Sequence, residues 1–227
     1  MAKKPSTLIN MVVALLVITA VSGGVLGLVY SMTKDAIAEV DKKKNEAAIQ
    51  KVLPLEGEIT YKPDTLKYNY EGVDLTFPCN LAYDANGTFK GAAVKTSEGG
   101  FGGKIELMVG IANDGTIKGV SVLSHSETPG LGANMDKVLV GQFADKKPGD
   151  HFVLEVTKNK EEGKVDAITA ATITSRAFTK AVEKAYQAFE TNKAQYMNNA
   201  PVKEETPVEE IPVEENNETT EGGQSNE

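Results

Sequence analysis

DAITAATITS, residues 166–175, is the stretch that says most about how this chain folds. It places small and hydroxyl-bearing residues directly before a segment in which apolar side chains recur at helical spacing, from Phe178 to Phe189. Thr174 or Ser175 is expected to cap this helix at its N-terminus. Backbone N–H groups and the helix dipole favour an anion at such a position. The stretch therefore predicts a site for a phosphate group beside an uncrowded threonine hydroxyl.

Two hairpins are predicted upstream of this stretch, and they indicate an antiparallel sheet. Leu81–Val94 and Ile105–Leu123 each hold two apolar runs around an Asn-Gly or Asn-Asp-Gly turn. A short helix is expected near Met135–Phe143 and a strand over Phe152–Val156, whereas Glu56–Pro78 is expected to be irregular. The predicted fold class is α+β, with a compact domain of twisted antiparallel strands flanked by helices.

The N-terminal segment is predicted to be a single transmembrane helix. Lys3 and Lys4 precede a charge-free run from Pro5 to Thr33, which meets the requirement of roughly 20 apolar residues for a spanning helix. A cleaved signal peptide is the alternative, but its apolar core is only about 7–15 residues long. Because a short stub before a single helix usually stays in the cytoplasm, we expect the remaining chain on the outer side of the cell (inner) membrane.

These patterns divide the chain into successive parts. Residues 1–33 are expected to form a cytoplasmic stub and anchor, 34–80 a helical stalk and irregular connector, 81–198 the folded domain, and 199–227 a disordered tail. From Pro201 onward there are nine Glu and one Lys, which account for the formal net charge of −8. Low hydrophobicity and dense charge in the tail favour disorder.

Composition also restricts the chemistry. Cys79 is the single cysteine, and His125 and His151 are far apart without metal-ligand spacing, so no metal site is predicted. The chain before Pro201 is close to neutral and holds no basic patch, which disfavours nucleic acid as a partner. Any redox chemistry must then come from a bound organic cofactor.

Two further glycine-containing segments are notable. HSETPGLG, residues 125–132, is expected to form a tight loop, because Pro129 and Gly130 suit the centre of a type II turn. GGFGGK, residues 99–104, lacks the residues that a phosphate loop requires before its last Gly and after its Lys. Its glycines are instead expected to let a backbone or a ligand approach closely.

The stretch 166–175 resembles the flavin-acceptor site of the FMN-binding domain family, Asp-x-x-(Ser/Thr)-(Gly/Ala)-Ala-Thr. The resemblance implies that a flavin transferase joins FMN to Thr172, the last threonine of the motif, through a phosphoester. It implies that the modifying enzyme needs Asp166. Three neighbouring hydroxyl residues would orient the phosphate by hydrogen bonds: Thr169, Thr174 and Ser175. The position of Ala170 is most often glycine in the family, so this chain departs slightly from the pattern.

The loop at 125–132 matches another signature of the same family, and the segment at 99–104 resembles a third. Signatures in the expected order are far more specific than any one alone. In the family the loop lies along the isoalloxazine ring of the flavin. The resemblance implies that Glu127 and Thr128 make polar contacts with the ring edge and that Leu131 packs on the ring face. It also implies that Gly130 and Gly132 let the backbone approach the ring closely.

Anchor, signatures and chain size together resemble the G subunits of the Rnf electron-transport complex. The resemblance implies a covalent-FMN electron carrier, which works with other membrane subunits of an ion-translocating ferredoxin:NAD⁺ oxidoreductase and turns over no substrate alone. Three alternatives stay open. The first is the C subunit of the Na⁺-translocating NADH:quinone reductase, a family that usually has a longer connector. The second is a stand-alone anchored flavoprotein reductase, and the third is a non-redox surface domain.

Overall fold

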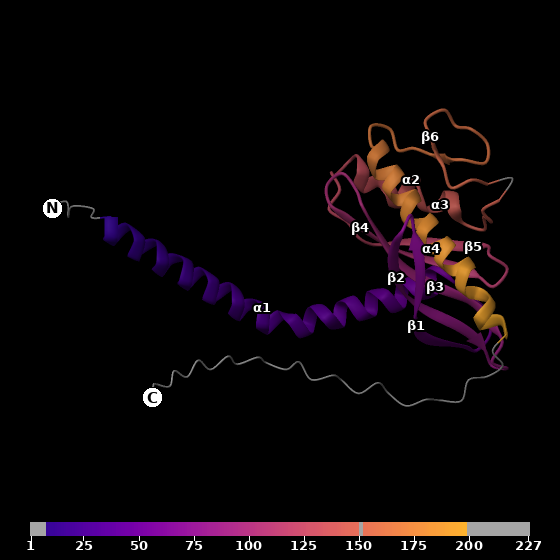
Figure 1. The fold of residues 1–227 in the computed structure, drawn as a ribbon, viewed down its shortest axis with the longest axis horizontal. Coiled ribbons are helices and arrows are strands. Elements are labelled where there is room, and N and C mark those ends of the chain that lie inside the picture. The colour runs from indigo at the N-terminus through magenta and orange to yellow at the C-terminus, as the bar shows by residue number, and fades with distance from the viewer. Residues whose placement is uncertain (1–7, 150–151, 199–227) are drawn as a thin grey trace, which may run out of the picture.

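A long N-terminal helix and a five-stranded sheet dominate the computed structural model, which describes residues 8–149 and 152–198 (Figure 1). Helix α1 runs unbroken over Leu8–Val52 and ends just before Pro54, which cannot continue it. Among the described residues, α1 is the one helix long and apolar enough to cross a membrane. Anchor and stalk are therefore one helix, while the tail expected to be disordered lies outside the described residues.

The sheet is an antiparallel meander in which every strand pairs with its neighbour in the sequence. Its strands are β1 (Ile59–Tyr70), β2 (Val73–Asp84), β3 (Phe89–Gly99), β4 (Lys104–Ala112) and β5 (Ile117–Ser124). The two hairpins predicted from their turns are present as β2–β3 and β4–β5. Together with the helices described below, this sheet confirms the predicted α+β class.

The prediction that Glu56–Pro78 is irregular is wrong, because the segment holds β1 and part of β2. The expected domain boundary at residue 81 consequently falls inside a strand. Leu66 and Phe77 pair across these two strands and are buried in the core. Burial by the rest of the fold thus stabilises strands whose charged residues and prolines gave only a weak local pattern.

The two faces of the sheet are covered by different helices. Helix α4 (Thr172–Asn198) packs across one face (Figure 1), where Phe178, Val182 and Phe189 are fully buried. The C-terminal end of α1 packs on a separate cluster that includes Ala93 and Met108. The residues next to Ala93 in β3 and next to Met108 in β4 belong to the cluster that packs against α4. Because successive strand residues point to opposite faces of a sheet, α1 lies on the face opposite α4.

Short elements connect β5 to α4. They are η1 (Gly132–Asn134), α2 (Met135–Val138), α3 (Val140–Phe143), β6 (Val156–Thr157) and β7 (Val165–Asp166). The helix expected near Met135–Phe143 is present as α2 and α3. The strand expected over Phe152–Val156 is wrong: only Val156 is in a strand, and it pairs in parallel with β7. Phe152 is buried because its ring meets Phe143 edge-on, with centroids 6.1 Å apart, and not because it belongs to a sheet.

Candidate functional site

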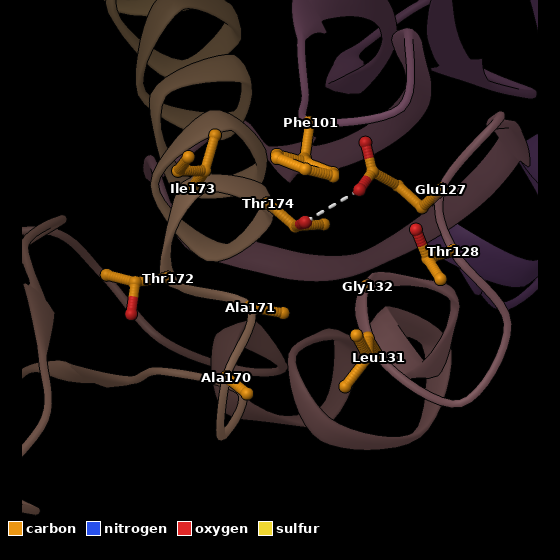
Figure 2. Close-up of a pocket in the computed structure, with 10 residues that line it drawn as sticks. All are labelled: Phe101, Glu127, Thr128, Leu131, Gly132, Ala170, Ala171, Thr172, Ile173 and Thr174. Carbon is orange, nitrogen blue, oxygen red and sulfur yellow. Dashed lines mark hydrogen bonds between the residues drawn. The ribbon is translucent and has the colours of Figure 1, made fainter.

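A cavity of about 350 Å³ lies where the N-terminus of α4 meets two glycine-containing turns (Figure 2). Three segments that are distant in sequence form it: the β3–β4 turn, the loop before η1 and the first turn of α4. The lining residues are Phe101, Glu127, Thr128, Leu131, Gly132, Ala170, Ala171, Thr172, Ile173 and Thr174. Segments 125–132 and 166–175, which were recognised in the sequence, therefore meet here, together with Phe101 of segment 99–104.

Helix α4 begins at Thr172, earlier than the sequence pattern indicated. Neither Thr174 nor Ser175 is therefore the N-cap, because both lie within the first helical turns. The Ser175 hydroxyl accepts a hydrogen bond from the backbone N–H of Ile168 at 2.9 Å and donates one to the carbonyl of Ala171 at 3.0 Å. Ser175 is fully buried and does not line the cavity. Its two hydrogen bonds hold residues 168–171 against the start of α4.

The start of α4 has the features of an anion site. The first N–H groups of a helix have no carbonyl partner inside it, and the helix dipole adds positive potential there. Ser175 N–H already bonds the carbonyl of Ala171 at 3.0 Å, which leaves the N–H groups of residues 172–174 without helical acceptors. Thr172 is half-buried at the edge of the cavity, on the side of Ala171 away from Leu131 (Figure 2). A phosphate ester on its hydroxyl would lie close to these donors.

Glu127 joins the three segments. Its side chain is 6% exposed, and its carboxylate accepts hydrogen bonds from the backbone N–H of Gly102 at 3.0 Å and from the Thr174 hydroxyl at 2.7 Å. Figure 2 shows the second bond crossing the floor of the cavity. A buried carboxylate needs such donors, since burial without them is costly. Glu127 thereby ties the β3–β4 turn and the loop before η1 to α4.

Glycines let these segments approach so closely. A Cβ at Gly132 would lie 2.6 Å from both Glu127 Oε2 and Thr174 Oγ1, and one at Gly102 would lie 2.2 Å from the carbonyl oxygen of Ser126. Neither position has room for a side chain. The glycines of segment 99–104 were expected to let a backbone or a ligand approach closely. At Gly102 it is the backbone of the neighbouring loop, at Ser126, that approaches.

Ala170 adopts the left-handed backbone conformation, with φ of +60°. Such a conformation is strained for a residue with a Cβ and unstrained for glycine. The preference for glycine noted for this motif position thus has a physical reason in this chain. Ala170 keeps the turn immediately before Thr172 at some cost in conformational energy.

The predicted site residues divide into two groups. The cavity is lined by six of them: Glu127, Thr128, Leu131, Gly132, Thr172 and Thr174. Four others do not line it: Thr169, Ser175, Gly130 and Asp166. Thr169 is exposed on the turn, and Gly130 has a φ of +80°, as expected for its turn position. Asp166 lies in β7, where Gln142 bonds both its backbone N–H, at 2.7 Å, and its carbonyl, at 3.1 Å.

Sequence reasoning assigned no site role to four lining residues, Ala170, Ala171, Phe101 and Ile173, and the last two have large side chains. Both are apolar and largely exposed, at 70% and 56%, and with Leu131, at 42%, they make the cavity apolar at its rim. Exposed apolar groups around a concave site are typical of ligand pockets. A lone aromatic residue between glycine pairs was the available signal for Phe101. Apolar walls beside a helix N-terminus suit a flat aromatic ligand that carries a phosphate.

His125 and Cys79 do not add chemistry to the site. His125 Nδ1 accepts a hydrogen bond from the backbone N–H of Glu127 at 3.2 Å, which is a structural role. Cys79 is buried in the core, and burial raises the pKa of its thiol to about 12, so it is a poor nucleophile. No group of His, Cys, Asp or Glu side chains suited to a metal ion occurs within the part of the chain that the structure describes.

Comparisons with known proteins identify the family of this chain and the relatives of its fold. A family described as FMN-binding domain matches residues 100–187. The chain is 33% identical over 197 residues to the G subunit of the ion-translocating oxidoreductase complex of Aliivibrio fischeri, covering 83% of this chain and 92% of that protein. It is 33% identical over 183 residues to the G subunit of the Na⁺-translocating ferredoxin:NAD⁺ oxidoreductase complex of Acetobacterium woodii, covering 78% and 88%. The crystal structure of NqrC from Shewanella oneidensis has a similar fold, with a TM-score of 0.54 at 19% identity over 70% of this chain and 99% of that one.

Proposed function

The chain belongs to the family of G subunits of ion-translocating oxidoreductase complexes, and we propose that it serves such a complex as the membrane-anchored electron carrier, with FMN bound covalently to Thr172. The anchor is α1, and the carrier is the domain that holds the cavity. Relatives named as ferredoxin:NAD⁺ oxidoreductase subunits favour that complex over the quinone reductase. The likeness to NqrC bears on the fold alone.

One observation carries the proposal of a covalent bond. Thr172 is at once the first residue of α4 and part of the wall of the apolar cavity. A phosphoester on its Oγ1 would place the phosphate at the helix N-terminus and leave the ring system free to enter the cavity. A cavity of about 350 Å³ falls in the range of small-molecule sites. The residues present therefore fit a covalently tethered FMN.

The side chains of this site would hold and orient the cofactor. Phe101, Leu131 and Ile173 offer apolar surface to its ring system, and Thr128 offers a hydroxyl. Glu127 acts mainly through Gly102 and Thr174, which it fixes in place. When bound, FMN supplies reversible uptake of one or two electrons. A tether keeps it in one place at high effective concentration, which matters for a carrier facing the cell exterior.

Two residues of the acceptor motif lie outside the cavity. Thr169 lies on the exposed turn, where the flavin transferase could contact it during maturation, and the same holds for the half-buried Asp166. The other subunits of the complex are the expected partners. We propose that the FMN domain lies on the outer side of the membrane and the N-terminus in the cytoplasm.

Replacing Thr172 with Ala tests the proposal. The full chain is produced together with a flavin transferase, denatured, and separated on a gel that is viewed for flavin fluorescence. The wild-type band should fluoresce and the Thr172→Ala band should be dark, because the ester oxygen is missing. Mass spectrometry of both intact chains should show the added mass of FMN on the wild type alone.

Thr191→Ala is the matched control, since it removes an exposed threonine hydroxyl of α4 that does not line the cavity. This variant should keep its fluorescence. A fluorescent Thr172→Ala chain together with a dark Thr169→Ala chain would transfer the attachment to Thr169. A wild-type band without fluorescence or added mass would refute covalent flavin altogether.

A further inference from the structure

The junction between the membrane helix and the sheet is built around two glycines. We call residues 34–52 of α1 the stalk, and we call Gly110 and Gly119, which pair directly across β4 and β5, the glycine seat. A Cβ at Gly110 would lie 2.0 Å from the carbonyl oxygen of Val52, and one at Gly119 would lie 3.4 Å from its Cα. The backbone at the end of the stalk therefore rests directly on the sheet, where a side chain at Gly110 would displace it.

Apolar burial and polar contacts reinforce this seat. Val52 and Leu53 are fully buried, and Ala48 and Ile49 are nearly so. Leu53 N–H donates to the carbonyl of Ile49 at 3.0 Å, and the Lys44 ammonium donates to the carbonyl of Leu123. The contacts extend from residue 44 to residue 53, more than two helical turns. They fix the direction of the stalk as well as its end point.

One strand connects the glycine seat to the cofactor cavity. β4 begins at Lys104, next to the turn that carries Phe101, and reaches Gly110 six residues later. At a rise of about 3.3 Å per residue, the two ends are roughly 20 Å apart along the strand. β4 is paired on both sides, with β3 and β5. A paired central strand transmits the position of the stalk to the cavity without a flexible joint.

We propose that the glycine seat makes stalk and domain one rigid body, which holds the cavity at a fixed height above the membrane for electron exchange with protein-bound redox centres outside the bilayer. Residues 34–43, which precede the contacts with the domain, are ten residues of helix, and at 1.5 Å each they separate the apolar run from these contacts by about 15 Å. Gly110 and Gly119 are positioning residues that act through Val52.

The inference rests on the proposed function, since it concerns where the bound FMN exchanges electrons. Electrons that reduce the flavin leave a redox centre of a donor subunit, and electrons that leave the flavin pass to a centre of an acceptor subunit. Protons that accompany reduction come from water. The stalk contributes position only and takes no part in this balance.

Hydrogen exchange tests the seat without any flavin. In the full chain in detergent, the amides of residues 48–53 should exchange on the order of a hundredfold more slowly than those of the exposed stalk at 36–43, because only the former are held by tertiary packing. Gly119→Val should abolish this difference. Gly141→Ala in α3 is the control, because a Cβ at Gly141 would have no atom within 4 Å, and this variant should preserve the difference in exchange. Equal exchange of the two stalk segments in the wild type would overturn the proposal.

Insertions in the exposed stalk test its consequence without touching the sheet. Seven helix-forming residues between Ala38 and Glu39 add two turns and about 10 Å of height with little rotation. Seven Gly and Ser residues at the same point make the joint flexible. Ferredoxin-dependent reduction of NAD⁺ by the assembled complex should fall by about tenfold or more in both variants, since small misplacements slow a positioned reaction strongly.

In-gel flavin fluorescence and chemical reduction of the flavin should be the same in both insertion variants as in the wild type. Wild-type turnover in the Gly-Ser variant would show that the domain moves freely and would overturn the rigid-body proposal alone. Absence of covalent flavin in the wild type would instead refute the proposed function. The hydrogen-exchange measurement would still test whether the glycine seat holds the end of the stalk, because it does not depend on flavin.

Discussion

At the scale of single residues, Glu127 has the largest structural effect on the site. Its position in the loop suggested a contact with the flavin ring, but its two carboxylate oxygens each accept a hydrogen bond from a different segment. The sequence distance to Thr174 is 47 residues, so no local pattern could reveal this bond. A single buried carboxylate thus sets the relative position of two turns and a helix.

Glu127→Ala should lower the free energy of unfolding of the full chain by about 2–4 kcal/mol, because it leaves the buried Thr174 hydroxyl without an acceptor and removes the bond from the Gly102 N–H. Glu127→Gln should cost about half as much, since its amide oxygen still accepts one bond. Thermal unfolding in detergent measures both. Equal stability of wild type and Glu127→Ala would show that the three segments are held by packing alone.

Ala170→Gly should stabilise the chain. Ala170 has a φ of +60°, a conformation that costs a residue with a Cβ about 1–2 kcal/mol relative to glycine. The greater freedom of glycine in the unfolded chain offsets part of this, by about 0.4–1 kcal/mol. A net gain of up to about 1.6 kcal/mol should therefore appear as a higher unfolding temperature. A lower temperature would mean that the methyl group packs favourably in the cavity wall.

At the scale of elements, the hairpin turns explain why this sheet could be recognised. Asp84 and Asp114 each accept hydrogen bonds from backbone N–H groups of their own turns, at 2.8–2.9 Å. These bonds depend on residues two to four positions apart, so the sequence contains them in full. The β1–β2 turn also holds such a bond, from the Gly72 N–H to Asn69 Oδ1 at 3.0 Å. The burial of Leu66 and Phe77, however, depends on α4, which lies about a hundred residues away in the sequence.

The turn carboxylates predict a loss of stability in acid. The backbone N–H of Thr116, together with its hydroxyl and nearby Lys147, lowers the pKa of Asp114 below its usual value of 3.8. The folded state binds this proton more weakly than the unfolded state does. The contribution is therefore complete above pH 3.8 and is lost as the pH falls through the lower folded pKa.

Asp114→Asn keeps an acceptor for the Thr116 N–H but cannot titrate there. Unfolding temperatures measured between pH 6 and pH 2.5 should fall less steeply for this variant than for the wild type below pH 4. Parallel curves would show that the turn bonds contribute equally in both states.

At the scale of the whole molecule, α1 decides where everything else lies. Its N-terminal part is exposed along its whole apolar length, as expected for a helix that meets lipid, whereas its last turn is buried in the domain. The same helix is both anchor and structural element (Figure 1). The apolar part of α1 and the candidate cavity are thereby connected through the packing of α1 on β4 and β5.

Reporter fusions after Asn198 test the proposed orientation. A fused alkaline phosphatase, which requires export, should be active in intact cells, and a fused green fluorescent protein exported in the unfolded state should be dark. The same reporters fused before Met1 should give the opposite results. Fluorescence from the fusion after Asn198 would place the domain in the cytoplasm and contradict the proposal.

The sequence by itself determined what depends on near neighbours: the apolar run of α1, the two turn-directed hairpins, the amphipathic helix α4 and the family motifs that name its cofactor. The tertiary structure decided which side chains line the candidate cavity. It buried Ser175, turned Glu127 into a link, added Phe101 and placed the end of α1 on two glycines. The physical reason is that burial and hydrogen-bond partners come from residues distant in the chain, whereas helical periodicity and turn chemistry act within a few residues.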